Sequence, residues 1–260
     1  MNLIEVQNLS LEIDKKPILK QVSFHLEEEK IFGLIGGSGS GKSTLFKAIL
    51  SLPLARQASL KGNIFIKGQK PERIQRRLIQ PIFQDPFVYF NPNWNLQEAL
   101  EEPLIINFKL NPEARLEKIQ SLLKEFSLET NILKQNIKKF SGGELQRLAI
   151  IRALLCEPEI LLMDEPVSAL DTVIQQEVVE IIRNLNREKK LSILFISHDI
   201  ELVSYLCDYI FVMKEGEIIE SGNPEQLYKN AAKDYTKLLF QSRNLQTIRR
   251  KIRKGNGTIE

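Results

Sequence analysis

A glycine-rich segment near the N-terminus has the residue types and spacing that bind phosphate groups. It fits the pattern G-x-x-x-x-G-K-[ST] and, with the threonine that follows, comprises Gly36, Gly37, Ser38, Gly39, Ser40, Gly41, Lys42, Ser43 and Thr44. Glycines let the backbone curl so that successive N–H groups point at phosphate oxygens. Lys42 is expected to reach the β- and γ-phosphates, and the Ser43 hydroxyl to bind Mg²⁺. We call these residues the phosphate loop, and their pattern predicts nucleotide binding. The other interpretation, a flexible Gly-Ser turn, is weak, because average composition produces such a match about once per hundred chains of this length.

Two adjacent acids follow a strongly apolar segment further along the chain. Residues 160–163 read Ile-Leu-Leu-Met and are followed directly by Asp164 and Glu165. Parallel sheets hold ligands at the carboxyl ends of their strands, so Asp164 is placed to orient Mg²⁺. Glu165 is placed to polarise the water that attacks the γ-phosphate. Alone, the pair could simply open an exposed loop, but beside a phosphate loop it favours hydrolysis over binding alone.

The elements that must position these residues alternate between strand-length apolar runs and helix-length amphipathic segments. This alternation predicts a mostly parallel α/β sheet. A helix is expected over 42–52, ended by Pro53. Strands are expected at 31–35, 62–67, 78–83, 159–163 and 191–197, with a hairpin of strands 209–213 and 217–220.

The stretch from about residue 95 to 155 has a different pattern. It contains several helical patterns and no convincing strand. One helix is opened by Asn111-Pro112, a capping residue followed by proline at the first helical position. We expect a helical lobe inserted into the α/β core.

One motif in this stretch points to a family. Residues 140–147 read Phe-Ser-Gly-Gly-Glu-Leu-Gln-Arg, and Ser141, Gly142 and Gly143 precede an amphipathic helix whose start suits an anion. The motif resembles the signature of the ABC ATPases, usually L-S-G-G-Q. It also lies between the phosphate loop and the carboxylate pair, as it does in that family.

Three further residues lie in motifs that match the family, in the family's order. Gln84 resembles the Q-loop glutamine, Asp171 ends a Ser-Ala-Leu-Asp run that resembles the D-loop, and His198 resembles the switch histidine at a strand end. The resemblance implies that two subunits pair head to tail. ATP would then lie between the phosphate loop of one subunit and Ser141-Gly142-Gly143 of the other. Gln84 would sense Mg²⁺, and His198 would contact the γ-phosphate.

The resemblance also implies the fold class and the domain organisation. The implied fold is a P-loop NTPase (RecA-like) α/β core with an N-terminal antiparallel β subdomain and an inserted α-helical subdomain. The expected ABC ATPase domain spans 1–242, with its core at 1–84 and 158–242 and its helical subdomain at about 85–157. Residues 243–260 form a basic tail, for which a solvated end is favoured over contact with lipid headgroups.

Two positions depart from the family pattern. Glu144 replaces the usual last glutamine of the signature, a change that keeps a side-chain oxygen. Ile13 stands where the family usually has an aromatic that stacks on adenine. An aliphatic side chain lacks a stacking gain of roughly 1 kcal/mol, so adenine binding is expected to be looser.

Composition limits where the protein acts. The chain has 260 residues, of which 43% are hydrophobic, and a net charge of +3, too small to indicate a nucleic-acid partner. Its apolar runs are too short to cross a bilayer, and Glu5 falls where a signal peptide needs apolar residues. Its two cysteines form no C-x-x-C pair, which favours a reducing compartment. With the resemblance, we expect a peripheral protein on the cytoplasmic face of the cell (inner) membrane.

The partners and the cargo come from the resemblance to one branch, which serves importers of di- and oligopeptides and of nickel. That branch implies a second ATPase subunit, identical or paralogous, two transmembrane permease subunits and an extracytoplasmic substrate-binding protein. Five aromatic residues cluster within a short stretch: Phe83, Phe87, Tyr89, Phe90 and Trp94. They form either a small core or an exposed patch for a permease helix. The compact chain leans towards the nickel-type members.

Two other classes compete with transport. A non-transport ATPase of the same superfamily, acting on nucleic acid or ribosomes, usually carries long coiled-coil or zinc insertions, or two cassettes in one chain. Only 99 positions separate Lys42 from Ser141, so transport is favoured. A P-loop kinase has no use for the Ser141-Gly142-Gly143 motif.

Overall fold

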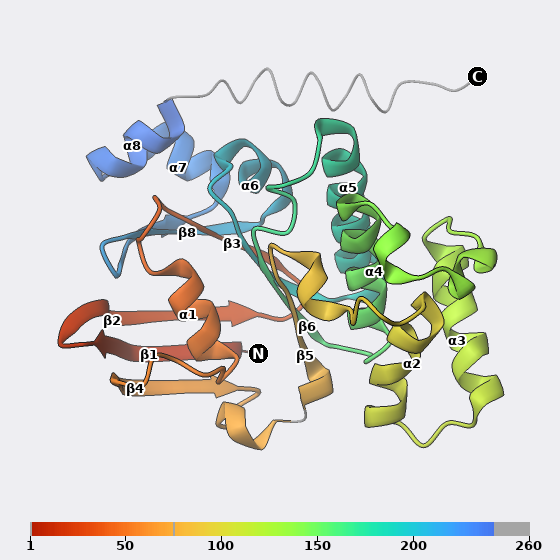
Figure 1. The fold of residues 1–260 in the computed structure, drawn as a ribbon. Coiled ribbons are helices and arrows are strands. Elements are labelled where there is room, and N and C mark those ends of the chain that lie inside the picture. Colours follow the sequence, from red (N-terminus) through yellow and green to blue (C-terminus); the bar gives the residue numbers. More distant parts are fainter. Residues whose placement is uncertain (1, 75, 242–260) are drawn as a thin grey trace, which may run out of the picture. The chain divides into compact units, whose positions relative to one another are not determined.

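The computed structural model describes residues 2–74 and 76–241 (Figure 1). These residues divide into two compact units. The first unit combines the N-terminal part of the chain, up to Arg73, with the part that starts at Ile193. The second unit runs from Ile74 to Ser192. The predicted basic tail 243–260 lies outside the described residues.

The first unit is built mainly from strands. Its elements are β1 (Asn2–Ile13), β2 (Lys16–Glu27), β3 (Ile31–Ile35), α1 (Lys42–Ile49), β4 (Ala58–Ile66), the 3₁₀ turn Pro71–Arg73, β7 (Ser192–Ile196), α6 (Ile200–Leu206), β8 (Tyr209–Lys214), β9 (Glu217–Gly222), α7 (Pro224–Asn230) and α8 (Asp234–Gln241).

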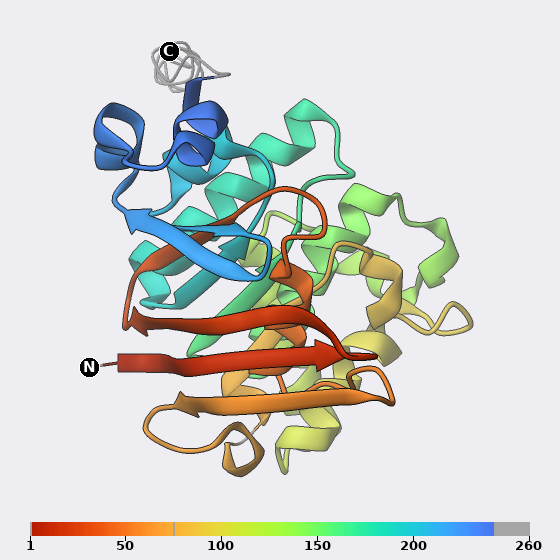
Figure 2. The ribbon, with the colours of Figure 1, turned by 90° about the vertical axis from the view of Figure 1, so that its left-hand side faces the viewer.

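Three long strands of this unit form an antiparallel sheet in the order β2-β1-β4, which Figure 2 shows as red and orange arrows side by side. Asp14 and Lys15 join β1 to β2 with φ angles of 51° and 62°, the left-handed values of a tight two-residue hairpin turn. The implied N-terminal antiparallel β subdomain is therefore present in the structure.

A second set of strands in the first unit is mostly parallel. β3 pairs in parallel with β7 on one side and with β8 on the other, and β9 pairs antiparallel with β8. Every residue of β3 and of β7 is buried. Burial of consecutive residues means that both faces of these strands are covered, which explains their continuous apolar sequences. The predicted hairpin of 209–213 and 217–220 is confirmed.

The second unit is mainly helical. Its elements are the 3₁₀ turn Arg76–Leu78, β5 (Ile79–Ile82), the 3₁₀ turn Pro86–Tyr89, α2 (Leu96–Asn107), α3 (Pro112–Glu125), the 3₁₀ turns Thr130–Lys134 and Ile137–Lys139, α4 (Gly142–Leu154), β6 (Ile160–Asp164) and α5 (Thr172–Lys189). β5 and β6 pair in parallel.

Capping residues set the starts of the helices in the second unit. Asn111 accepts a hydrogen bond from the Ala114 N–H and Pro112 is the first residue of α3, as the sequence predicts. Asn95 forms a capping box with Glu98 at the start of α2. Each cap satisfies backbone N–H groups that a helix start leaves unpaired, so both helices begin at defined residues.

One helix boundary differs from the prediction. α1 ends at Ile49 rather than at Leu52, because Ser51 adopts a φ of 50° and the Leu52 N–H bonds to the Lys47 carbonyl. The chain therefore leaves the helix through a left-handed residue, the usual C-terminal signal, before Pro53 has any effect.

Within the described residues, no helix is long and apolar enough to span a bilayer.

Gly33 in the middle of β3 has no room for a side chain. A methyl group there would lie 2.4 Å from Val203 Cγ1 and 3.2 Å from Cys207 Sγ, where α6 covers the strand. We expect Gly33→Ala to lower the free energy of unfolding by about 1–3 kcal/mol through overpacking, measured by denaturant titration.

Val203→Ala supplies the matched control for that prediction. It removes the atom that the new methyl group meets, so the double variant should lose at least about 0.5 kcal/mol less than the sum of the single variants. Strict additivity would show that the two side chains do not compete for the same space.

Candidate functional site

The phosphate loop joins the carboxyl end of β3 to the start of α1, in the first unit. Its first glycine, Gly36, is buried, and a methyl group there would lie only 2.2 Å from the Met213 carbonyl oxygen of β8. Its last glycine, Gly41, has a φ of 105°, and a methyl group there would meet Leu19 of β2 at 3.0 Å. Glycine at these two positions lets the loop backbone lie directly on β8 and β2.

Lys42 is folded over this loop. Its side chain is buried, and its ammonium donates hydrogen bonds to the carbonyl oxygens of Gly36 at 2.8 Å and Gly37 at 2.9 Å. Ser43 follows on the exposed first turn of α1. Gly41, the N-cap of α1, offers no side-chain oxygen, so the first N–H groups of the helix keep their capacity to bind an anion.

The β8–β9 turn holds the loop from a second side. The Gly216 N–H donates to the Ser40 carbonyl at 3.0 Å, and the Lys20 N–H of β2 donates to the Gly216 carbonyl at 2.9 Å. Gly216 has a φ of 86°, and a methyl group there would lie 2.5 Å from the Ile18 carbonyl oxygen. Sequence reasoning identified this turn only as part of a hairpin. Its Glu-Gly dipeptide could have indicated a position that requires glycine, but not its contact with the loop.

His198 emerges from the strand that neighbours β3. β7 pairs with β3 in parallel, Leu34 opposite Ile196, and the Ser197 N–H donates to the Leu34 carbonyl at 3.3 Å. The exposed His198 and the phosphate loop therefore leave adjacent strands at the same edge. Asp199 caps α6 by accepting hydrogen bonds from the N–H groups of Glu201 and Leu202, which fixes the turn that carries the histidine.

The remaining predicted residues belong to the second unit. Asp164 ends β6, and both it and Glu165 are half-buried. Glu165 has a φ of 49°, and its carbonyl accepts hydrogen bonds from the N–H and the hydroxyl of Ser168 at 3.3 and 3.1 Å. A left-handed glutamate costs roughly 1–2 kcal/mol, and the turn closed by these two hydrogen bonds holds Glu165 in that conformation.

Ser141 and Glu144 form a capping box at the start of α4. The Ser141 N–H and hydroxyl both donate to Glu144 Oε2 at 2.8 Å, and the Glu144 N–H donates to Ser141 Oγ at 3.3 Å. The bonds from the Ser141 backbone and hydroxyl lower the pKa of the Glu144 carboxyl below its usual range. The carboxylate therefore serves as the acceptor that a glutamine oxygen would provide, so the departure from the family signature keeps the cap.

The signature lies beside the D-loop helix within the second unit. A methyl group on Gly143 would lie 2.9 Å from Ile174 Cγ2 of α5, and Arg147 pairs with Glu177 at 3.1 Å. Asp171 caps α5 by accepting hydrogen bonds from the N–H groups of Val173 and Ile174. Two predicted motifs that are far apart in sequence thus open adjacent helices.

Gln84 and the aromatic cluster lie between β5 and α2. Gln84 is exposed. The Tyr89 hydroxyl accepts a hydrogen bond from the Phe83 N–H at 2.6 Å and donates to the Pro81 carbonyl at 2.9 Å, and burial raises its pKa. Phe87, in contrast, is 54% exposed.

The two interpretations of the aromatic cluster therefore each describe part of it. Phe90 is buried, and the Tyr89 hydroxyl is hydrogen-bonded to the backbone at the end of β5. Phe87 and its neighbour Val88, in contrast, are exposed to solvent.

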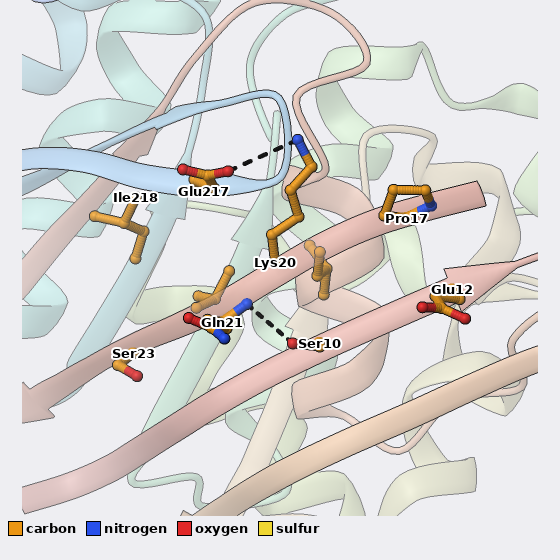
Figure 3. Close-up of a pocket in the computed structure, with 10 residues that line it drawn as sticks. Ser10, Glu12, Pro17, Lys20, Gln21, Ser23, Glu217 and Ile218 are labelled. Carbon is orange, nitrogen blue, oxygen red and sulfur yellow. Dashed lines mark hydrogen bonds and ion pairs between the residues drawn. The ribbon is translucent and has the colours of Figure 1, made fainter. Parts of the chain in front are cut away.

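An open groove of about 570 Å³ lies over β1, β2 and the start of β9 (Figure 3). Lys20 pairs with Glu217 across it at 3.7 Å, and the Gln21 N–H donates to Ser10 Oγ at 3.0 Å. None of its lining residues belongs to the phosphate loop. Ile13, the position expected beside adenine, is half-buried at the end of β1, opposite Lys16.

The predicted magnesium ligands have suitable chemistry, each within its own unit. Ser43 of the first unit has a hydroxyl, and Gln84 and Asp164 of the second have an amide and a carboxylate, which are hard oxygen ligands of the kind that Mg²⁺ takes together with substrate phosphates. Within residues 2–74 and 76–241, no group of three or more His, Cys, Asp and Glu residues could hold a metal ion by itself.

Comparison with known proteins decides the family. The sequence profile of the ABC transporter family matches residues 19–168, more than half of the chain. The chain belongs to the ABC transporter family. It is an ATP-binding cassette with an α/β P-loop fold, and it is an ATPase. The predicted family, fold class and enzyme class are confirmed.

Two curated proteins and one solved structure are similar to this ABC ATPase. A dipeptide transport ATP-binding protein of Haemophilus influenzae is 38% identical over 227 residues, which cover 86% of this chain and 69% of that protein. A putative peptide import ATP-binding protein of Brucella ovis is 39% identical over 228 residues, which cover 86% and 72%. An ATP-binding cassette solved as a dimer in a post-hydrolysis state with ADP and phosphate has 26% identity and a TM-score of 0.72, covering 85% of this chain and 98% of that one.

Proposed function

We propose that this ABC ATPase drives the uptake of di- or oligopeptides by an importer. The observation that carries the proposal is its similarity, 38% and 39% over 86% of the chain, to proteins named for dipeptide transport and peptide import. In such an importer the cargo contacts other subunits. The residues of this chain therefore determine ATP binding and hydrolysis and not which substrate is transported. Nickel complexes remain the alternative cargo.

In the proposed site, ATP lies between two subunits that pair head to tail. The phosphate loop of one subunit holds the phosphates, and Ser141, Gly142 and Gly143 of the other close over them. The start of α4 supports this, because its Ser141 cap accepts the Glu144 N–H and leaves those of the exposed Gly142 and its neighbour Gly143 able to bind an anion. Gly142 supports it further. Within the described chain, a methyl group there meets no atom within 4 Å outside its own helix, so the fold leaves this position open.

We infer the roles of the remaining residues from their positions in the fold, where most of them lie at strand ends or helix starts. Ser43, Gln84 and Asp164 would hold Mg²⁺, which neutralises phosphate charge when it is bound. Glu165 would polarise the attacking water, and His198 would donate a hydrogen bond to the γ-phosphate. Asp171, at the start of α5, would contact the neighbouring subunit near its nucleotide.

The proposed partners are a second ATPase subunit, two transmembrane permeases and an extracytoplasmic binding protein, with no nucleic acid. This subunit would lie on the cytoplasmic face of the membrane. Phe87 and Val88 are proposed to receive a cytoplasmic helix of a permease, since exposed large apolar side chains favour protein contacts. The division into a core at 1–84 and 158–242 and a helical subdomain at about 85–157 remains a prediction.

Alanine substitutions at the neighbouring residues Gly142 and Gly143 distinguish an effect on stability from an effect on ATP hydrolysis. We expect Gly143→Ala to lower the free energy of unfolding by about 1 kcal/mol more than Gly142→Ala, since only the former meets Ile174. Gly142→Ala should nevertheless reduce ATPase activity at least tenfold, about 1.4 kcal/mol of transition-state stabilisation. A Gly142→Ala variant with full activity would argue against a nucleotide at this helix start.

The role of Glu165 is tested by Glu165→Gln. We expect this variant to bind ATP with unchanged affinity, to hydrolyse it at least a hundredfold more slowly and to accumulate as a dimer, because the amide cannot act as the base. Light scattering with and without ATP measures the dimer, and Lys42→Ala, which should lose nucleotide binding, is the matched control. Wild-type turnover by the glutamine variant would contradict the assignment.

The cargo is tested by reconstitution with the permeases and the binding protein in vesicles. We expect di- and oligopeptides, rather than nickel complexes, to be taken up in an ATP-dependent manner and to stimulate the ATPase. Phe87→Ser should lower co-purification with the permeases, whereas Leu60→Ser, at an exposed apolar residue of β4 outside the proposed patch, serves as the control. Uptake of nickel complexes alone would overturn the peptide assignment, and association with ribosomes or DNA instead of permeases would overturn transport.

A further inference from the structure

The C-terminal helix of the first unit contacts the phosphate loop directly. The Gly37 N–H donates a hydrogen bond to the Tyr235 hydroxyl oxygen at 2.8 Å, joining residues 198 positions apart. A methyl group on Gly37 would lie 3.2 Å from the same oxygen, so the glycine also allows the close approach. Gly37 is otherwise an exposed residue of the loop.

Tyr235 is itself held in place from two sides. The Lys214 ammonium lies 5.2 Å from the centre of its ring, a cation–π contact at the end of β8. Glu220 of β9 accepts hydrogen bonds from the N–H groups of Ala232 at 2.6 Å and Lys233 at 3.1 Å, directly before α8. Burial raises the pKa of the Glu220 carboxyl, but interactions with the Thr236 side chain and with these two N–H groups outweigh burial and hold the pKa below its usual range.

The peptide groups around Gly37 link Tyr235 to Lys42. The Gly37 N–H bonds to the tyrosine, while its carbonyl accepts from the Lys42 ammonium at 2.9 Å. A glycine-rich loop loses about 1–2 kcal/mol of backbone entropy per residue when it is ordered around a phosphate. A contact that orders Gly37 beforehand reduces that cost and so strengthens binding.

We propose that Tyr235 is a positioning residue of the phosphate loop: through the Gly37 N–H it holds the loop and Lys42 in the arrangement that receives the phosphates of ATP. The tyrosine touches no reacting atom. It makes α8 a determinant of nucleotide affinity. This inference rests on the proposed phosphate loop.

Tyr235→Phe removes the hydroxyl and keeps the ring over Lys214. A hydrogen bond of ordinary strength corresponds to about a three- to tenfold change in an equilibrium constant, so we expect the Kd for ATP and the KM to rise by that factor. The kcat at saturating ATP and the midpoint of thermal unfolding without nucleotide should stay near wild type. Titration calorimetry with ATP and with ADP measures the affinity on the full chain.

Control variants separate the possible outcomes. Tyr228→Phe removes a hydroxyl from an exposed tyrosine on α7 and should change neither affinity nor KM. Lys214→Gln removes the cation over the ring and should weaken ATP binding less than Tyr235→Phe does. A purely structural role of Tyr235 would lower the unfolding midpoint and leave the Kd unchanged, and that result would overturn the proposal.

Lys42→Ala in the same titration distinguishes this inference from the assignment on which it rests. If Lys42→Ala loses ATP binding while Tyr235→Phe binds like wild type, only the positioning role fails. If Lys42→Ala also binds like wild type, the phosphate loop itself is wrongly assigned.

Discussion

The close approach of the phosphate loop to its neighbouring strands is the constraint on which the rest of the site depends. A side chain at Gly36 would collide with the Met213 carbonyl of β8, and Gly41, beside Leu19 of β2, has a φ of 105°, which residues with side chains rarely adopt. Because only glycine permits these contacts, the loop backbone can form hydrogen bonds with the β8–β9 turn and with α8. The position of this one short loop therefore depends on four elements: the antiparallel strand β2, the parallel strands β3 and β8, and helix α8.

Several predicted site residues of this ABC ATPase lie at helix starts, and these helix starts differ in whether a side chain caps them. Ser141, Asp171 and Asp199 each satisfy the first N–H groups of a helix with a side-chain oxygen, which fixes the backbone of the signature, the D-loop and the histidine turn. The start of α1 has no such side-chain cap. It follows the phosphate loop directly, and a capping side chain there would compete with the phosphates that the loop is proposed to hold.

Much of the fold could be predicted because local signals were strong. β3 and β7 are short apolar runs that become fully buried parallel strands, and Asn111-Pro112 opens a helix where the capping rule expects one. The end of α1 was mispredicted because Pro53 is the visible stop in sequence, while the left-handed residue Ser51 acts first. The aromatic cluster could not be assigned from sequence either, since the same residue type is buried at Phe90 and exposed at Phe87.

Local patterns in the sequence predict the chemistry and indicate the family. They are the glycine and lysine spacing of the phosphate loop, the two acids after an apolar strand and the Ser-Gly-Gly motif, and each reflects a backbone geometry set by a few adjacent residues. Only the packing of the chain shows which distant segments support that chemistry. The Tyr235 hydroxyl accepts a hydrogen bond from the loop backbone and the Gly216 N–H donates one to it, and nothing in the sequence of the loop indicates either partner. Local geometry is encoded over a few adjacent residues, whereas contacts across nearly 200 positions depend on how strands and helices pack.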